Sequence, residues 1–198
     1  PLRTAGLPEG APSDWMDVNP RHEWEGTVAF AEAYAAMGDA GVVGLSVGLP
    51  GLSVRDVDRI YRYFDDPAQV IAECQREHER IVRRTREIVQ LTPRPDFVLI
   101  GISGFMLANP EPIFRRLALP TLQAVTAICR EAGIPSQIHC CGPEYALVKI
   151  SAEESDLTSI NPLEIPPMGD CNLAQIKREF GHRLSLMGNL HTTQVMLL

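Results

Sequence analysis

An uninterrupted apolar run in the middle of the chain, Phe97–Ile102, restricts the folds that this sequence can adopt. It follows a turn-forming stretch of alternating prolines, residues 93–96, which ends the preceding element. A strand that is covered on both faces is apolar throughout, whereas a strand with one wet face alternates between apolar and polar residues. The run therefore predicts a strand buried on both faces, as in a parallel sheet.

Segments with helical periodicity alternate with this strand and with other strand candidates. The longest begins at Asp66-Pro67, a capping residue followed by proline at the first helical position. The predicted helices cover residues 21–38, 53–64, 66–90, 109–129, 145–154 and 172–180, and the predicted strands cover residues 42–47, 97–103, 136–141, 157–164 and 184–187. Such alternation is typical of a parallel α/β fold.

The number of strands bears on which α/β fold this is. A (β/α)8 barrel needs about 200 to 400 residues, and the chain has 198. We therefore expect one barrel domain over residues 1–198, with a loop-like segment at 1–20 and missing strands beyond the C-terminus. A five-stranded doubly wound sheet is the rival fold. No Gly-x-Gly-x-x-Gly turn follows the first predicted strand, which counts against that rival.

Charge and cysteine content exclude some classes of function. The net charge of −7 argues against nucleic acid or an anionic membrane surface as a partner. No run of 18 apolar residues predicts a membrane span. The five cysteines form an odd set without the spacing of a small disulfide scaffold. We therefore expect reduced thiols and a cytoplasmic protein.

The stretch His139-Cys140-Cys141-Gly142 lies at the end of a predicted strand. Because side chains alternate along a strand, His139 and Cys141 should share one face and Cys140 should take the other. An imidazole and a thiolate in this arrangement are a pair of zinc ligands. Glu164 ends the next predicted strand and could complete a three-ligand open site or act as a general base. The plainer alternative is a buried histidine beside a structural thiol.

Other polar residues follow the ends of predicted strands, where the reactive groups of α/β barrels collect. Ser103, Asn161 and Asn189 hold such positions and are candidate substrate contacts. Met168 follows two prolines in a stiff turn that could form the wall of a pocket. Ordinary loop packing explains these residues equally well, and Cys171 is a weaker candidate ligand.

Residues 96–198 resemble the uroporphyrinogen decarboxylase-like superfamily of (β/α)8 barrels. The segments that carry the resemblance are Asp96–Gly101, Phe114–Pro120, Gly133–Pro135, His139–Gly142, Ile160–Glu164, Gly181–Leu184 and Leu186–Leu190. This set is specific to the superfamily and much less specific to one reaction.

Two branches of the superfamily imply different chemistry. Corrinoid-dependent methyltransferases carry His-x-Cys-Gly and bind zinc, and His139, Cys141 and Gly142 match that motif. The related cobalamin-independent methionine synthase adds a glutamate on the following strand, at the place of Glu164. Both use a further cysteine near the end of the barrel, which has no counterpart in this chain. True decarboxylases carry an arginine-rich N-terminal motif that is not found here.

The resemblance therefore implies a zinc-dependent methyltransferase that moves a methyl group between a corrinoid, or a similar carrier, and a thiol or folate acceptor. Its partners would be a small-molecule substrate and a corrinoid carrier protein. One alternative is uroporphyrinogen decarboxylase, which acts without metal. Another is a non-catalytic barrel fragment that docks a corrinoid protein. An open parallel edge also favours association into a homo-oligomer.

Overall fold

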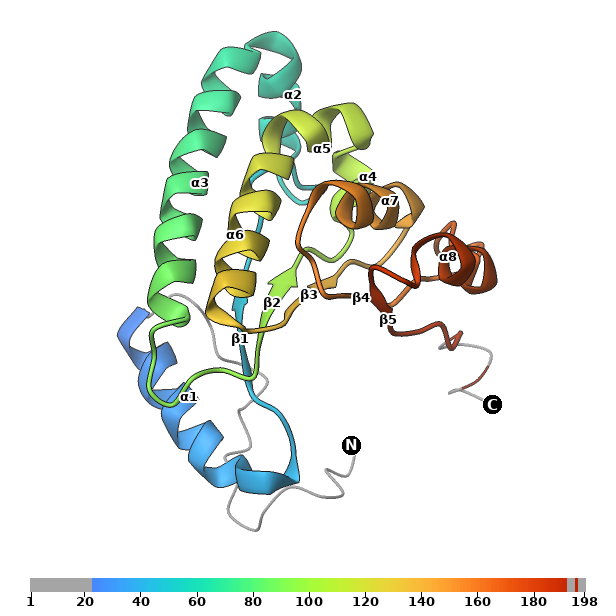
Figure 1. Cartoon of the computed structure of the whole chain (residues 1–198). Coiled ribbons are helices and arrows are strands. Elements are labelled where there is room, and N and C mark those ends of the chain that lie inside the picture. The colour runs from blue at the N-terminus through green and yellow to red at the C-terminus, as the bar shows by residue number, and fades with distance from the viewer. Residues whose placement is uncertain (1–22, 192–194, 196–198) are drawn as a thin grey trace.

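The computed structural model describes residues 23–191 and 195, and for residues 23–29 only the backbone. Its centre is a parallel sheet whose strands lie side by side in chain order (Figure 1). The strands are β1 (Gly44–Val47), β2 (Phe97–Gly101), β3 (Ser136–His139), β4 (Ser159–Asn161) and β5 (Ser185–Leu186). The parallel α/β prediction is confirmed for these residues.

The helices lie between the strands in sequence, so each connection is a crossover. They are α1 (Glu23–Met37), η2 (Gly38–Ala40), α2 (Val57–Asp65), α3 (Pro67–Ile88), α4 (Phe105–Ala108), α5 (Glu111–Leu117), α6 (Leu119–Ala132), α7 (Tyr145–Glu154) and α8 (Leu173–Phe180). In Figure 1, α3, α6, α7 and α8 follow one another along the sheet. A doubly wound sheet reverses its strand order at a switch point. This sheet has no reversal, so the rival topology does not describe it.

The two faces of the sheet differ in burial. Val98, Ile100, Ile138 and Ile160 are fully buried and belong to the main core cluster. Their neighbours along the strands, such as Leu99, are only half-buried. The expectation that β2 is covered on both faces is therefore wrong for the described residues, because helices cover one face and the second face has no layer over it.

Several predicted boundaries also differ from the structure. The predicted strand at 157–164 is shorter, since β4 ends at Asn161 and the backbone leaves the sheet at Pro162. The helical segment at 109–129, which the sequence predicts to be interrupted at Pro120, is two helices, α5 and α6, that meet at Ala118. The short helix α4 was not predicted. The loop-like segment expected at residues 1–20 lies outside the described residues.

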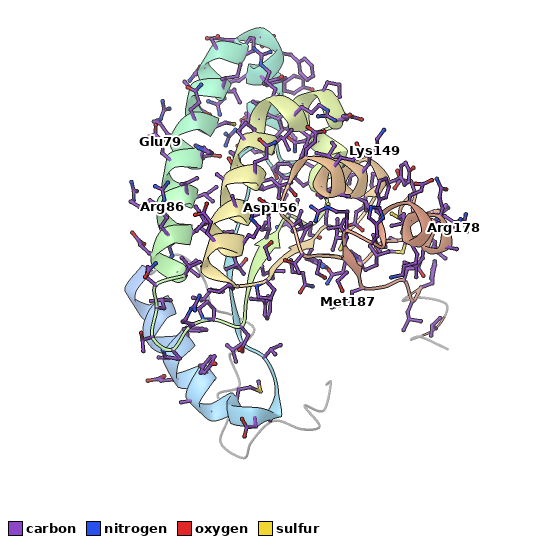
Figure 2. All side chains as sticks on the ribbon, viewed as in Figure 1. Glu79, Arg86, Lys149, Asp156, Arg178 and Met187 are labelled. Carbon is purple, nitrogen blue, oxygen red and sulfur yellow. The ribbon has the colours of Figure 1, made fainter. Side chains whose placement is uncertain are left out.

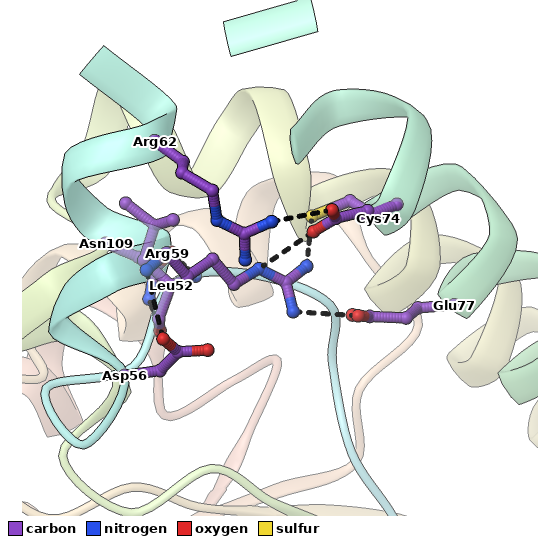
Figure 3. Close-up of polar contacts among 8 residues, drawn as sticks. Leu52, Asp56, Arg59, Arg62, Cys74, Glu77 and Asn109 are labelled. Atoms are coloured by element: carbon purple, nitrogen blue, oxygen red, sulfur yellow. Dashed lines mark hydrogen bonds and ion pairs between the residues drawn. The ribbon is translucent and has the colours of Figure 1, made fainter. Parts of the chain in front are cut away.

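The loop after β1 is attached to α4 by one buried side chain, that of Asn109. Its Oδ1 accepts a hydrogen bond from the Leu52 N–H at 2.8 Å, and its Nδ2 donates to the carbonyl oxygens of Leu52 and Phe105 at 2.8 and 2.9 Å. Figure 3 shows Asn109 and Leu52 together. Buried backbone groups need such partners, so Asn109 holds this loop beside the strand ends.

A smaller core cluster under α2 contains the buried Cys74. Cys129 is buried in the main core cluster. The Cys74 sulfur accepts a hydrogen bond from Nη2 of Arg59 at 3.2 Å, and Nη1 of the same arginine pairs with Glu77 at 2.8 Å (Figure 3). Burial raises the pKa of Cys74 despite the guanidinium beside it. This thiol is therefore a structural one. Among the described residues, no helix combines the length and apolarity needed to span a membrane.

Candidate metal centre

His139 and Cys141 lie together at the end of β3. Nε2 of His139 is 3.4 Å from Sγ of Cys141, and both side chains are half-buried. Cys140 between them is fully buried in the main core, as alternation predicts. Burial raises the pKa of the Cys140 thiol to about 12. Gly142 follows with a φ of 99°, a conformation that favours glycine and turns the chain away from the strand.

The separation of the two donor atoms suits one metal ion. Zinc binds imidazole nitrogen at about 2.0–2.1 Å and thiolate sulfur at about 2.3 Å, and a tetrahedral angle between these bonds places the donors about 3.5 Å apart. The distance between Nε2 and Sγ is 3.4 Å. The spacing of these two donor atoms is therefore that of two ligands of one zinc ion.

Asn161 orients the imidazole. It is the register partner of His139 on β4, and its Oδ1 lies 2.6 Å from Nδ1 of His139. Its Nδ2 donates to the sulfur of Met187 at 3.5 Å, which is consistent with the amide oxygen facing the histidine. Because an amide oxygen only accepts, Nδ1 donates this hydrogen bond, and the ring is held with Nε2 facing Cys141. Asn161, which the sequence predicts as a substrate contact, is thus hydrogen-bonded to a ligand candidate.

Glu164 lies beside the pair but is engaged elsewhere. Its Oε2 accepts a hydrogen bond from the Gly142 N–H at 2.6 Å. It is not the strand end that the sequence predicted, because it lies three residues beyond the last residue of β4. In the part of the chain that the structure describes, no group of three His, Cys, Asp or Glu residues is placed to hold a metal ion. The predicted three-ligand set is therefore not assembled in this conformation.

The sequence reasoning missed Glu144, which is fully buried next to this site. Its Oε2 accepts from the Leu163 N–H at 2.7 Å, while its Oε1 has no hydrogen-bond partner among the described residues. Burial raises its pKa from 4.5 to about 8, and the nearby carboxyl groups of Glu164 and Asp170 act in the same direction. Glutamate just before a helix is usually a solvated end residue, so the sequence carried no signal of this burial.

Asp170 joins the same two loops. Its Oδ1 accepts from the backbone N–H groups of Glu144 and Tyr145 at 2.8 and 3.0 Å, at the start of α7. Asn172 caps α8 by accepting from Gln175, whereas Asp170 serves the preceding helix. Glu144 after β3 accepts a hydrogen bond from the loop after β4, and Asp170 after β4 accepts hydrogen bonds from the loop after β3. Each loop therefore supplies an acceptor to the other.

No contact is shown between the pair and the other predicted site residues within the described part of the chain. Ser103 is exposed in the turn before α4, Met168 is 45% exposed, and Asn189 is half-buried after β5. No hydrogen bond between described residues joins any of the three to His139 or Cys141. Cys171 is buried, and burial raises the pKa of its thiol to about 12, so it is not poised as a ligand.

Comparisons with protein-family models, with curated proteins and with solved structures found no match to this chain. The resemblance to the uroporphyrinogen decarboxylase-like superfamily therefore depends on the motif residues alone.

Proposed function

We propose that this chain forms part of a (β/α)8 barrel of the uroporphyrinogen decarboxylase type and acts as a zinc-dependent methyltransferase. The observation that carries the proposal is the 3.4 Å separation of Nε2 of His139 and Sγ of Cys141, with Asn161 fixing the imidazole. The sequential order of the five strands supports the barrel, because a barrel adds each strand next to the previous one.

The reaction would transfer a methyl group from a corrinoid or similar carrier to a thiol or folate acceptor. His139 and Cys141 would hold the ion, and Asn161 would keep Nε2 turned toward it. A zinc ion held there would keep a substrate thiol in the thiolate form, which is the nucleophilic form. The thiolate sulfur would form a bond to the methyl carbon as the bond between the methyl group and its carrier breaks, and the bonding electrons would leave with the carrier. Glu164 becomes available as a third ligand or a base once it releases the Gly142 N–H.

The partner, the cellular location and the assembly of the protein are part of the same proposal. The methyl carrier would be presented by a corrinoid protein docking at the carboxyl ends of the strands, and the protein would act in the cytoplasm. The exposed edges of the sheet at β1 and β5 would pair with further barrel strands or with another copy of the chain.

Metal analysis of the purified protein tests the proposal. We expect one zinc ion per chain in the wild type, and none after Cys141→Ser. Cys140→Ala is the matched control, since the neighbouring thiol belongs to the core and should not affect the metal content. A wild-type protein without zinc, or a Cys141→Ser protein that keeps its zinc, would refute the assignment.

A second candidate function is favoured by the same geometry. A thiol within reach of an imidazole whose other nitrogen is held by an amide is also the arrangement of a nucleophilic cysteine with its base and orienting group. Without metal, Cys141 would give its proton to His139 and attack a thioester carbonyl. The acyl carbon would form a bond to the Cys141 sulfur as its bond to the substrate sulfur breaks, and the leaving thiolate would take the proton from His139. Alkylation by iodoacetamide after chelation tests this candidate: selective labelling of Cys141 that slows after His139→Ala would support it, and slow labelling unaffected by that substitution would exclude it.

A further inference from the structure

The backbone N–H group of Gly142 directly follows Cys141 and is bound to a carboxylate. Oε2 of Glu164 accepts this hydrogen bond at 2.6 Å. Glu164 reaches the group from the loop after β4, 22 positions further along the chain. A carboxylate oxygen is therefore held next to the residue that carries the thiol.

This N–H group has the position of an oxyanion donor. When a serine or cysteine attacks a carbonyl carbon, the carbonyl oxygen becomes negatively charged, and backbone N–H groups stabilise it. In α/β-hydrolases, one of these groups belongs to the residue directly after the nucleophile. Gly142 is that residue with respect to Cys141, so covalent geometry keeps its N–H group near the thiol. Oε2 of Glu164 is bound to the donor that an oxyanion would use.

The other groups that such a site needs lie on the ends of β3 and β4. Nε2 of His139 is 3.4 Å from Sγ of Cys141, and Nδ1 of His139 is 2.6 Å from Oδ1 of Asn161. These three side chains correspond to a nucleophile, its base and the residue that orients the base. The arrangement for acyl transfer is thus present, but its oxyanion donor is already occupied by Glu164.

The thiol lies at an accessible edge of the sheet. All five cysteines are in the described part of the chain, and Cys141 is the one among them that is not buried. A Cβ added to Gly142 would lie 3.9 Å from its nearest atom beyond the chain neighbours, in Leu107, so the space on that side is open. Met187, whose sulfur contacts Asn161, is 54% exposed and lies at the margin of the molecule (Figure 2).

From this arrangement we infer that the Gly142 N–H is the oxyanion donor of a cysteine acyl-transfer site, and that Glu164 inhibits the site by occupying this donor. Both roles belong to the second candidate function, which operates without metal, and zinc binding does not depend on them. The substrate class is an acyl thioester, and the acyl group passes first to Cys141 and then to water.

Each acyl transfer begins when the Cys141 thiol passes its proton to His139. The sulfur forms a bond to the carbonyl carbon of the thioester, and the π electrons of the carbonyl group move onto its oxygen. The Gly142 N–H donates a hydrogen bond to this oxyanion once Glu164 has left it. The oxyanion then collapses, the bond to the substrate sulfur breaks, and the leaving thiolate takes the proton from His139. Water hydrolyses the acyl-cysteine, which releases a carboxylic acid and restores the thiol.

Two reagents separate the role of the oxyanion donor from simple exposure of the thiol. p-Nitrophenyl acetate acylates a thiol through an oxyanion, whereas iodoacetamide alkylates it by direct displacement and forms none. Both rates at Cys141 are measured on the full chain after chelation, by nitrophenolate release and by intact mass. Cys141→Ser supplies the background for each reagent.

Glu164→Gln replaces the carboxylate by a neutral amide, which binds an N–H group less strongly. We therefore expect the ratio of the acylation rate to the alkylation rate to rise about fivefold. Glu164→Ala frees the donor completely and should raise the ratio further, by up to about 100-fold, the usual contribution of one oxyanion donor. The charge of Glu164 also affects the acidity of the thiol, but this effect enters both reactions and cancels in the ratio.

Asp170→Asn is the matched control. It removes a carboxylate from the same pair of loops, but Asp170 accepts its hydrogen bonds from the N–H groups of Glu144 and Tyr145, whereas the Gly142 N–H is bound to Glu164. The ratio should therefore stay at the wild-type value. Circular dichroism shows whether each variant folds, and either Glu164 variant suffices if the other does not.

Glu164 variants that accelerate acylation and alkylation equally would show that this side chain only shields the thiol, and would overturn the inference. A ratio that falls would show that Glu164 assists acyl transfer, and would overturn it as well. If Cys141 is not acylated in the wild type or in any variant, the second candidate function fails together with the inference. The zinc proposal is decided separately, by the metal content of the purified protein.

Discussion

The side-chain oxygen of Asn161 lies 2.6 Å from Nδ1 of His139, on the neighbouring strand at the same register. This contact determines which imidazole nitrogen faces Cys141, because the nitrogen that donates to Asn161 cannot also offer a lone pair. A histidine at a strand end becomes a directed ligand only through such a partner.

Removing this partner should weaken metal binding without removing a ligand. For Asn161→Ala we expect zinc affinity to fall about 10- to 100-fold, the usual effect of losing a group that orients a metal-binding histidine. Competition with a chromophoric chelator measures the change. Asn161→Asp retains an acceptor for Nδ1 and should bind zinc more tightly than the alanine variant. Equal affinity in all three proteins would show that Asn161 does not orient the ligand.

Gly169 should tolerate no side chain, because the loops after β3 and β4 meet there. A Cβ at this position would collide with the carbonyl oxygens of Glu164 and Gly142, which are backbone atoms with little freedom to move. We expect Gly169→Ala to destabilise the protein by about 1–3 kcal/mol, measured by urea unfolding. Gly48→Ala is the control, since nothing lies within 4 Å of its added Cβ, and it should change stability little.

Asn109→Ala should destabilise the protein more than an ordinary polar-to-alanine substitution. The change removes three hydrogen bonds and leaves the buried Leu52 N–H without its side-chain acceptor. We expect a loss of about 2–4 kcal/mol in the free energy of unfolding. Asn172→Ala removes an exposed helix cap and should cost only about 1 kcal/mol. Similar losses for the two variants would contradict the structural role given to Asn109.

Glu144 should make stability depend on pH in a defined direction. Its pKa rises from 4.5 to about 8 on folding, so between these values the folded protein retains a proton that the unfolded chain has lost. The free energy of unfolding therefore falls as pH increases from about 5 to about 8, and it levels off above that range. Unfolding curves at pH 5, 7 and 9 measure this dependence.

Glu144→Gln should remove this contribution, because glutamine does not titrate. The variant is expected to gain stability relative to the wild type between pH 5 and pH 9, by on the order of 2 kcal/mol. The exposed Glu79→Gln control should follow the wild-type curve. A wild type whose stability rises over this range relative to Glu144→Gln would show that the buried carboxyl is ionised in the folded state.

The alternation of strands and helices was predictable from local patterns. Apolar runs such as Phe97–Ile102 and helix starts such as Asp66-Pro67 act over a few residues, and the structure contains the predicted parallel sheet. Boundaries were less predictable where the chain leaves the sheet. The predicted strand continued through residues 162–164, but β4 ends at Asn161 and Leu163 takes a φ of 61°.

The candidate site was predictable only in part. Alternation along β3 placed His139 and Cys141 together, because that rule is local. The roles of Asn161 and Glu164 depend on contacts between residues 22 positions apart, and no short pattern specifies them. Glu144 was not recognised at all, since its burial follows from the packing of two loops.

The sequence by itself determined the parallel α/β order and brought an imidazole and a thiol to one strand end, because both follow from the geometry of single strands and helices. Only the tertiary structure decided that Asn161 orients the imidazole, that Glu164 bonds to Gly142, and that a carboxyl group is buried behind them. These contacts form where the loops after β3 and β4 meet. Tertiary packing determines which polar groups in the two loops become hydrogen-bond partners.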